Sequence, residues 1–155
     1  MNEYLVVKTI HVISSTILFG TGIGSAYYML TASLGRDPRV VHAVVRQVVR
    51  ADWFFTTPSV IVQPLTGLWL VHLAGFPWAS TWIVASIALY LLAGACWLPV
   101  VWMQIRMREM ARAAAVENTP LPPQYDRYLR AWTGLGVIAF TAVVGVFGLM
   151  VAKPA

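Results

Sequence analysis

The sequence has 155 residues, of which 59% are hydrophobic and only 11% are charged, and its mean hydropathy is +0.70. A soluble domain of this length does not bury so apolar a composition in one core, so the composition excludes a soluble globular protein and favours a membrane protein. The formal net charge of +5 does not indicate a nucleic-acid partner, because the basic residues lie between long apolar runs and no RNA-binding motif accompanies them.

Four apolar segments are long enough to cross a bilayer, since a hydrocarbon core of ~30 Å requires ~20 helical residues. They are residues 4–31, 53–75, 81–104 and 131–152, and none carries Asp, Glu or Arg at mid-span. Only helices and closed barrels satisfy their backbone in lipid, and these runs lack the alternation of barrel strands. The sequence therefore predicts an all-α integral membrane four-helix bundle that forms a single domain over residues 1–155.

An additional amphipathic helix is expected between the first two spans, on the cytoplasmic side. Asp37 suits the N-cap and Pro38 the first helical position. Polar residues then recur every three or four positions opposite a valine-rich face, at Arg39, His42, Arg46 and Arg50. This helix should lead into the second span, which Pro58 and Pro64 should bend, because each removes a backbone donor.

The arginines predict the orientation of the bundle. All of them follow the first or third span, whereas the short connection 76–80 carries no charge. By the positive-inside rule the arginine-rich loops are cytoplasmic and both termini lie outside, with Tyr4, Trp78 and Trp82 in the outer aromatic belt. Without a targeting peptide, the sequence favours a multi-pass protein of the bacterial inner membrane with periplasmic N and C termini.

Two histidines are the main candidate site residues, because ionisable groups inside a membrane are costly. His11 lies about two turns into the first span and His72 about one turn from the outer end of the second, which places both at similar depth. Two imidazoles on facing helices form the geometry that holds a haem iron from both sides. We therefore expect haem b between helices one and two, with His11 and His72 as iron ligands. The alternative is that each histidine only hydrogen-bonds a neighbouring helix.

Small and polar residues surround these histidines in the sequence. Gly20, Gly22 and Gly24 allow close approach of either a flat macrocycle or a neighbouring helix. Gln63 either donates to a haem propionate or quinone oxygen, or satisfies carbonyls that a proline leaves free. Asp52 is interpreted as an ion-pair partner of Arg50 or as a helix-end residue, Gln104 as the polar end of the third span, and the lone Cys96 as a packing residue. Two histidines are too few for a convincing zinc site.

Long stretches of the chain resemble a known family, namely YLVVKTIHVISSTILFGTGIGSAYYM, VVRADWFFTTPSVIVQPLTGLWL, WLPVVWMQIRM and LMVAKP. Together they resemble the predicted integral membrane proteins known as DUF2269, over nearly the whole chain. The K-x-x-H pattern of Lys8 and His11 is more distantly similar to HemJ-type protoporphyrinogen oxidases and CopD-like membrane proteins. This similarity implies that His11 binds haem, as the helix-one histidine of HemJ-like proteins does. Those proteins also use a lysine in a later helix, whereas this chain has none between Lys8 and Lys153.

The leading hypothesis is a b-type cytochrome-like protein of the lipid bilayer that exchanges electrons with a quinone or a periplasmic redox partner. A HemJ-like porphyrinogen oxidase is the second hypothesis, so the sequence leaves open whether the protein is an enzyme. The third is a cofactor-free or copper-handling membrane component. No nucleophile-base pair, phosphate loop or carboxylate pair supports hydrolytic chemistry. Assembly as a homo-oligomer also stays open.

Overall fold

The computed structural model describes residues 2–154, and every regular element in this range is helical. The elements are α1 (Glu3–Gly35), α2 (Pro38–Ala51), the π-helical turn η1 (Asp52–Thr56), α3 (Thr57–Leu73), α4 (Thr81–Glu117) and α5 (Pro123–Ala152). The helical stretches Glu3–Gly35, Pro38–Leu73, Thr81–Glu117 and Pro123–Ala152 are each long and apolar enough to cross a membrane. The all-α membrane fold predicted from the sequence is therefore confirmed.

The ends of the helices follow from local sequence. Asp37 caps α2 by accepting a hydrogen bond from the backbone N–H of Arg39 at 2.9 Å, and Pro38 occupies the first position, as predicted. Arg36 and Asn118 end α1 and α4 in the left-handed conformation, with φ of 57° and 54°. At the arginine-rich end, the helices continue through polar residues beyond the apolar segments.

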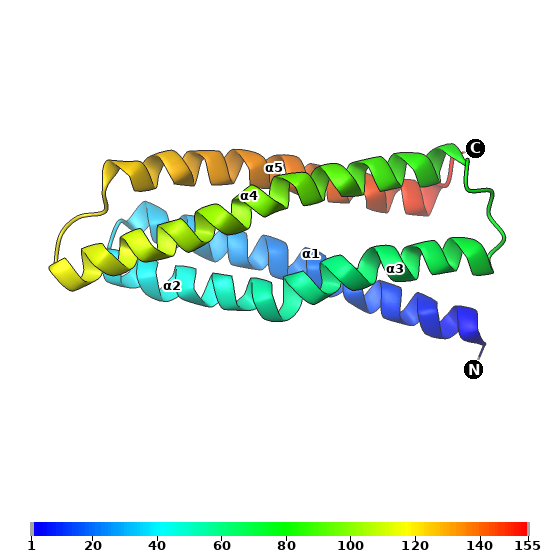
Figure 1. Cartoon of the computed structure of the whole chain (residues 1–155), viewed down its shortest axis with the longest axis horizontal. Helices are drawn as coiled ribbons and strands as arrows, with labels where there is room; N and C mark the ends of the chain where they lie inside the picture. Colours follow the sequence, from blue (N-terminus) through cyan, green and yellow to red (C-terminus); the bar gives the residue numbers. More distant parts are fainter. Residues whose placement is uncertain (1, 155) are drawn as a thin grey trace.

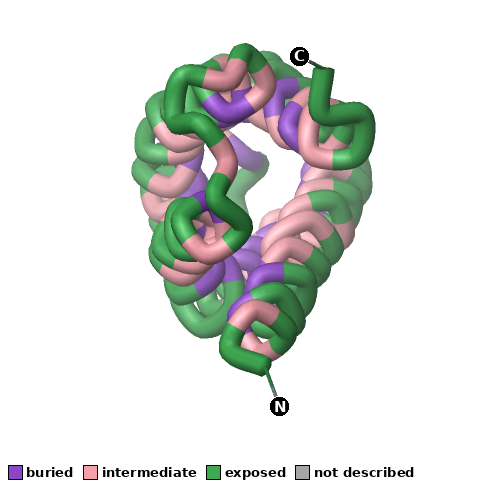
Figure 2. The backbone as a smooth tube through the Cα atoms, turned by 90° about the vertical axis from the view of Figure 1, so that its right-hand side faces the viewer, coloured by how far each residue is buried: buried purple, intermediate pink, exposed green. Residues whose placement is uncertain are grey.

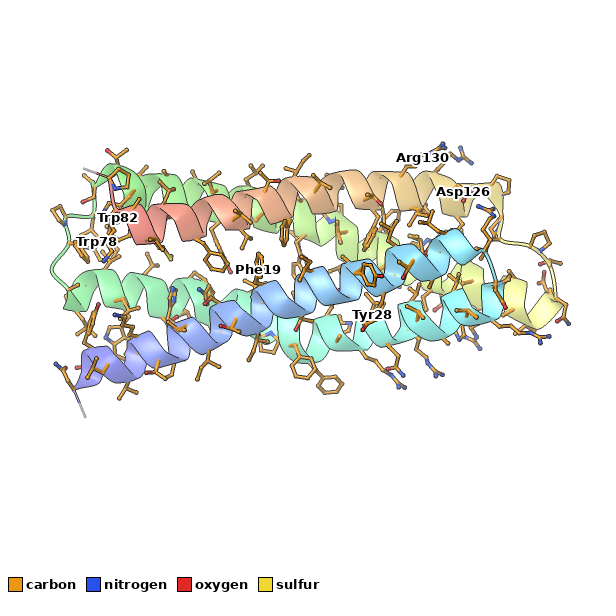
Figure 3. All side chains as sticks on the ribbon, turned by 180° about the vertical axis from the view of Figure 1, so that it is seen from behind. Phe19, Tyr28, Trp78, Trp82, Asp126 and Arg130 are labelled. Carbon is orange, nitrogen blue, oxygen red and sulfur yellow. The ribbon has the colours of Figure 1, made fainter. Side chains whose placement is uncertain are left out.

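The four long stretches run along one axis, and both termini lie at one end of the bundle together with the connection between α3 and α4 (Figure 1). Figure 3 shows Trp78 and Trp82 at this end, and Asp126 and Arg130 at the opposite end. The arginine-rich connections thus share one end of the bundle and the termini the other. Which of these ends faces the cytoplasm stays a prediction from the positive-inside rule.

The main apolar core lies at the arginine-rich end, where α2 fills the space between α1 and α4. Val41, Val45, Met29, Met107 and Tyr125 are fully buried there. The hydroxyl groups of Ser33 and Tyr125 form a 2.7 Å hydrogen bond between α1 and α5. At the rim, Arg36 pairs with Asp126 at 2.8 Å, and this hydrogen bond and charge raise the pKa of Arg36.

Towards the end that carries the termini, α1 packs on α3 and α4 packs on α5, without α2 between the two pairs. Figure 2, seen from that end, shows the helices arranged around the long axis. The α1–α3 pair and the α4–α5 pair contact each other at a few positions only. Phe19 of α1 lies 4.9 Å from Phe140 and 5.4 Å from Phe147 of α5, measured between ring centroids, and Figure 3 shows Phe19 on the side of α1 that faces α5.

Pro64 explains one link between α3 and α4. Proline has no N–H, so the carbonyl of Val60, four residues earlier, loses its helical partner. The hydroxyl of Tyr90 on α4 donates to this carbonyl at 2.6 Å. A neighbouring helix thus satisfies the backbone group that the proline leaves free, as lipid surroundings require.

Candidate functional site

The inward face of the second span changes from apolar to polar at η1. In α2 this face carries Val41, Val45 and Val48. The same spacing of three and four residues continues through Asp52, Thr56, Ser59 and Gln63, all of which are buried. The π-helical turn lies where this change occurs, and such turns are frequent at functional sites. The bundle therefore carries a buried polar stripe along α3.

A cavity of about 430 Å³ lies between α1, α4, α5 and η1. Its surface is overwhelmingly apolar, and aromatic side chains contribute much of it. The aromatic residues are Phe19, Tyr27, Tyr90, Trp97, Trp132 and Phe140. A volume of this size falls in the range of small-molecule sites, which lie commonly between the helices of bundles.

Glycines from three helices enlarge this cavity. Gly22 of α1, Gly94 of α4 and Gly136 of α5 all line it. A Cβ atom added at any of the three would meet no other part of the described chain within 4 Å. Glycine inside a helix costs roughly 0.5–1 kcal/mol relative to alanine, and here close helix packing does not explain it. Gly22 therefore lies beside open space and does not serve as a contact for a neighbouring helix.

Polar groups gather at the end of the cavity nearer the arginines. The carboxylate of Asp52 accepts a hydrogen bond from the hydroxyl of Thr56 at 2.8 Å. Gln104 and Trp132, also in the cavity wall, are 3% and 6% exposed. Within residues 2–154, the Oε1 atom of Gln104 and the Nε1 atom of Trp132 have no hydrogen-bond partner. Each such orphaned group costs about 1–3 kcal/mol. A ligand that donates a hydrogen bond to the Oε1 atom of Gln104 and accepts one from the indole N–H of Trp132 would remove this cost.

A second, smaller cavity of about 330 Å³ lies on the other side of the same polar groups. Asp52, Trp97 and Gln104 line both cavities. The smaller cavity also involves Trp53 and Trp102, which are 58% and 53% exposed on the outside of the bundle. Asp52 and Gln104 therefore stand between the central cavity and a space that reaches the lipid-facing surface.

His11 lies in a separate polar cluster between α1 and α3. Its Nδ1 atom is 2.8 Å from the hydroxyl of Thr66, which itself donates to the carbonyl of Val62. The hydroxyl of Thr66 therefore accepts from Nδ1–H, and the Nε2 atom of His11 accepts from the side-chain amide of Gln63 at 3.1 Å. A Cβ atom added at Gly67 would lie 3.2 Å from the imidazole, so the ring packs against that glycine. Both nitrogens of His11 are thus engaged in hydrogen bonds within the bundle.

His72 lies elsewhere, in the last turn of α3, and is exposed. It follows Gly67, the residue beside His11, by five positions. At about 100° and 1.5 Å per residue, this places His72 roughly 140° around the helix and about 7.5 Å further along it. The structure therefore does not bring His72 to the face of α3 that His11 contacts.

A haem between α1 and α3 does not fit this arrangement. The nitrogen of His11 that would ligate iron is held by Gln63, and the ring packs on Gly67. His72 faces away, and neither histidine lines the central cavity. Among the described residues, no group of three or more His, Cys, Asp or Glu side chains forms a metal site. Ligation of haem b by His11 and His72 stays a prediction from the sequence alone.

Asp52 and Gln104 are the site residues that the sequence interpretation missed. The sequence indicates an ion pair with Arg50 or a helix-end role for Asp52. Asp52 does form the C-cap of α2, but it is 6% exposed, and the ion pairs found within residues 2–154 do not include it. The spacing of Val41, Val45 and Val48 was the available signal, because the next residue on that face is Asp52.

Comparison with known proteins gives a single assignment. No curated protein and no solved structure matches the chain, and the more distant similarity to HemJ-type and CopD-like proteins is not shown. A model of the predicted integral membrane proteins matches residues 5–154, which is nearly the whole chain. The protein therefore belongs to the DUF2269 family of predicted integral membrane proteins.

Proposed function

We propose that this protein binds a small amphipathic molecule taken from the lipid phase. The apolar body of the ligand fills the central cavity, and its polar group contacts Asp52, Gln104 and Trp132. The observation that carries the proposal is the pairing of a 430 Å³ apolar cavity with unpartnered buried polar atoms in its wall. Sites for small molecules combine these same features, namely a mostly apolar lining and a few convergent polar groups.

The glycines support the same function. Three helices each place a glycine where a larger residue would fit the backbone but occupy the cavity. Because glycine weakens a helix, its presence at Gly22, Gly94 and Gly136 needs a compensating role. Room for a ligand supplies that role, whereas close contact between helices does not.

The position of the polar groups along the helices sets the depth of the ligand. Asp52, Gln104 and Trp132 each lie two residues from an arginine, namely Arg50, Arg106 and Arg130 respectively. By the positive-inside rule, the polar end of the ligand then lies towards the cytoplasmic leaflet of a bacterial inner membrane. The apolar body extends from there towards the end that carries the termini.

A matched pair of substitutions tests the proposal. Gly136→Leu places an isobutyl group in the cavity, whereas Gly134→Leu adds the same group at an exposed position outside it. Neither added Cβ atom meets another part of the described chain within 4 Å. Both variants should therefore fold, and only the first should block the cavity.

Binding is measured by tryptophan quenching with 12-bromododecanol in nanodiscs of zwitterionic lipid, because Trp97 and Trp132 line the cavity. We expect saturable quenching in the wild type and in Gly134→Leu, and its loss in Gly136→Leu. Quenching that is linear in probe concentration, or equal in all three proteins, would mean that the probe only dissolves in the bilayer and would refute the proposal.

A further inference from the structure

Building on the proposed function, we infer that the natural ligand is a lipophilic amine whose protonated nitrogen pairs with the carboxylate of Asp52. The amine would occupy the polar end of the central cavity, between Asp52 and Gln104. Its apolar part would lie among the aromatic residues of the wall.

The charge of Asp52 is the first argument. Its side chain is buried, inside a helical stretch that spans the membrane. The ion pairs found within residues 2–154 join Arg36 to Asp126, and Glu109 to Arg108 and Arg112, all on exposed or half-buried side chains. A buried carboxylate requires a positive partner or a proton, because a lone charge in a medium of low dielectric is costly. A cationic ligand supplies this partner, and without one the carboxyl group takes up a proton.

Hydrogen-bonding capacity is the second argument. Asp52 presents acceptor oxygens, of which Oδ1 receives one bond from Thr56, and the side-chain amide of Gln104 also interacts with the carboxyl group. The Oε1 atom of Gln104 is a further acceptor without a partner in the described chain. Two acceptor groups that line the same cavity match the several N–H donors of an ammonium group. A ligand with a carboxylate or phosphate head would place like charge beside Asp52, which disfavours that class.

The aromatic wall is the third argument. Trp97 lines both cavities together with Asp52 and Gln104, and Tyr27, Tyr90 and Trp132 line the central cavity. Faces of aromatic rings attract cations, and more strongly where water is excluded, so such a wall suits an amine better than a neutral head group. In the wall of the central cavity, the indole N–H of Trp132 is a donor without a partner in the described chain, and it provides a contact for one oxygen atom of the ligand.

The test compares three compounds that share one chain, namely dodecylamine, dodecanol and dodecanoate. Each competes with 12-bromododecanol for the cavity of the full-length protein in zwitterionic nanodiscs. At neutral pH the amine is cationic, the alcohol neutral and the acid anionic. We expect dodecylamine to bind at least about tenfold more tightly than either of the others, as a charge-assisted hydrogen bond predicts. This comparison in the wild type requires no variant.

A variant without the charge then tests whether Asp52 causes the preference for the amine. Asp52→Asn should lose the preference for the amine and keep its affinity for dodecanol, because the side chain keeps its size. Glu109→Gln serves as the control, since Glu109 is an exposed carboxylate near the same end, and it should leave all affinities unchanged. A loss of amine preference in Glu109→Gln would show surface attraction and overturn the inference.

The outcomes separate the two proposals. Equal binding of amine and alcohol in the wild type, or an unchanged preference in Asp52→Asn, overturns the amine inference and leaves the cavity site standing. Tighter binding of dodecanoate also overturns it. Failure of every compound to displace the probe, together with no effect of Gly136→Leu, overturns the proposed function itself.

Discussion

The hydrogen bond from Tyr90 to Val60 makes a prediction that depends on Pro64. Tyr90→Phe removes the hydroxyl that satisfies the carbonyl of Val60 and keeps the ring. Side-chain hydrogen bonds within membrane bundles contribute ~0.6 kcal/mol on average and up to ~1.7 kcal/mol. This bond should lie in the upper part of that range, because the carbonyl has lost its helical partner to Pro64.

Pro64→Ala restores an N–H group that can reach the carbonyl of Val60. In this background Tyr90→Phe should cost almost nothing, so a double-mutant cycle should give a coupling energy of about 1.2–1.7 kcal/mol. The free energy of unfolding is measured by circular dichroism as SDS is titrated into mixed micelles. An equal cost of Tyr90→Phe in both backgrounds would refute the explanation, since the hydroxyl would then act independently of the proline.

Three further predictions concern other parts of the bundle. Thr66→Val should lower the free energy of unfolding by about 0.6–1.7 kcal/mol in the same titration, because it removes the partner of His11, whereas Thr141→Val on the exposed side of α5 should change it little. In a visible absorption spectrum, the engaged nitrogens of His11 and the exposure of His72 predict no Soret band. A Soret band that His11→Ala or His72→Ala abolishes would instead establish the haem b site expected from the sequence. For orientation, a cysteine at Lys153 should react with impermeant maleimide from outside intact cells, and one in the connection between α4 and α5 should not. The reverse pattern would invert the topology.

The fold was predictable because its signals are local. Apolar length alone defines four helical stretches that can span a bilayer, and Asp37 with Pro38 defines the start of α2. The arginines that end the apolar segments did not end the helices, because arginine is a good helix former and its side chain reaches water from the rim. Thus α4 continues to Glu117 and α5 begins at Pro123.

The candidate site was less predictable because it depends on which helices meet. Gly20 and Gly22 have similar surroundings in the sequence, yet only Gly22 lines the cavity. Asp52 lies beside Arg50 in the chain, but the two side chains leave the helix on different faces, one buried and the other exposed. His11 was correctly identified as an intramembrane polar residue, but its partners Thr66 and Gln63 became visible only from the packing of α1 on α3.

The most direct test of the central claim is native mass spectrometry of the protein extracted from its own membranes in lipid nanodiscs, for the wild type, Gly136→Leu and Gly134→Leu. We predict an added mass of a small amphipathic molecule on the wild type and on Gly134→Leu, and its absence from Gly136→Leu. No added mass on the wild type, or the same added mass on all three proteins, would contradict a ligand site in the central cavity.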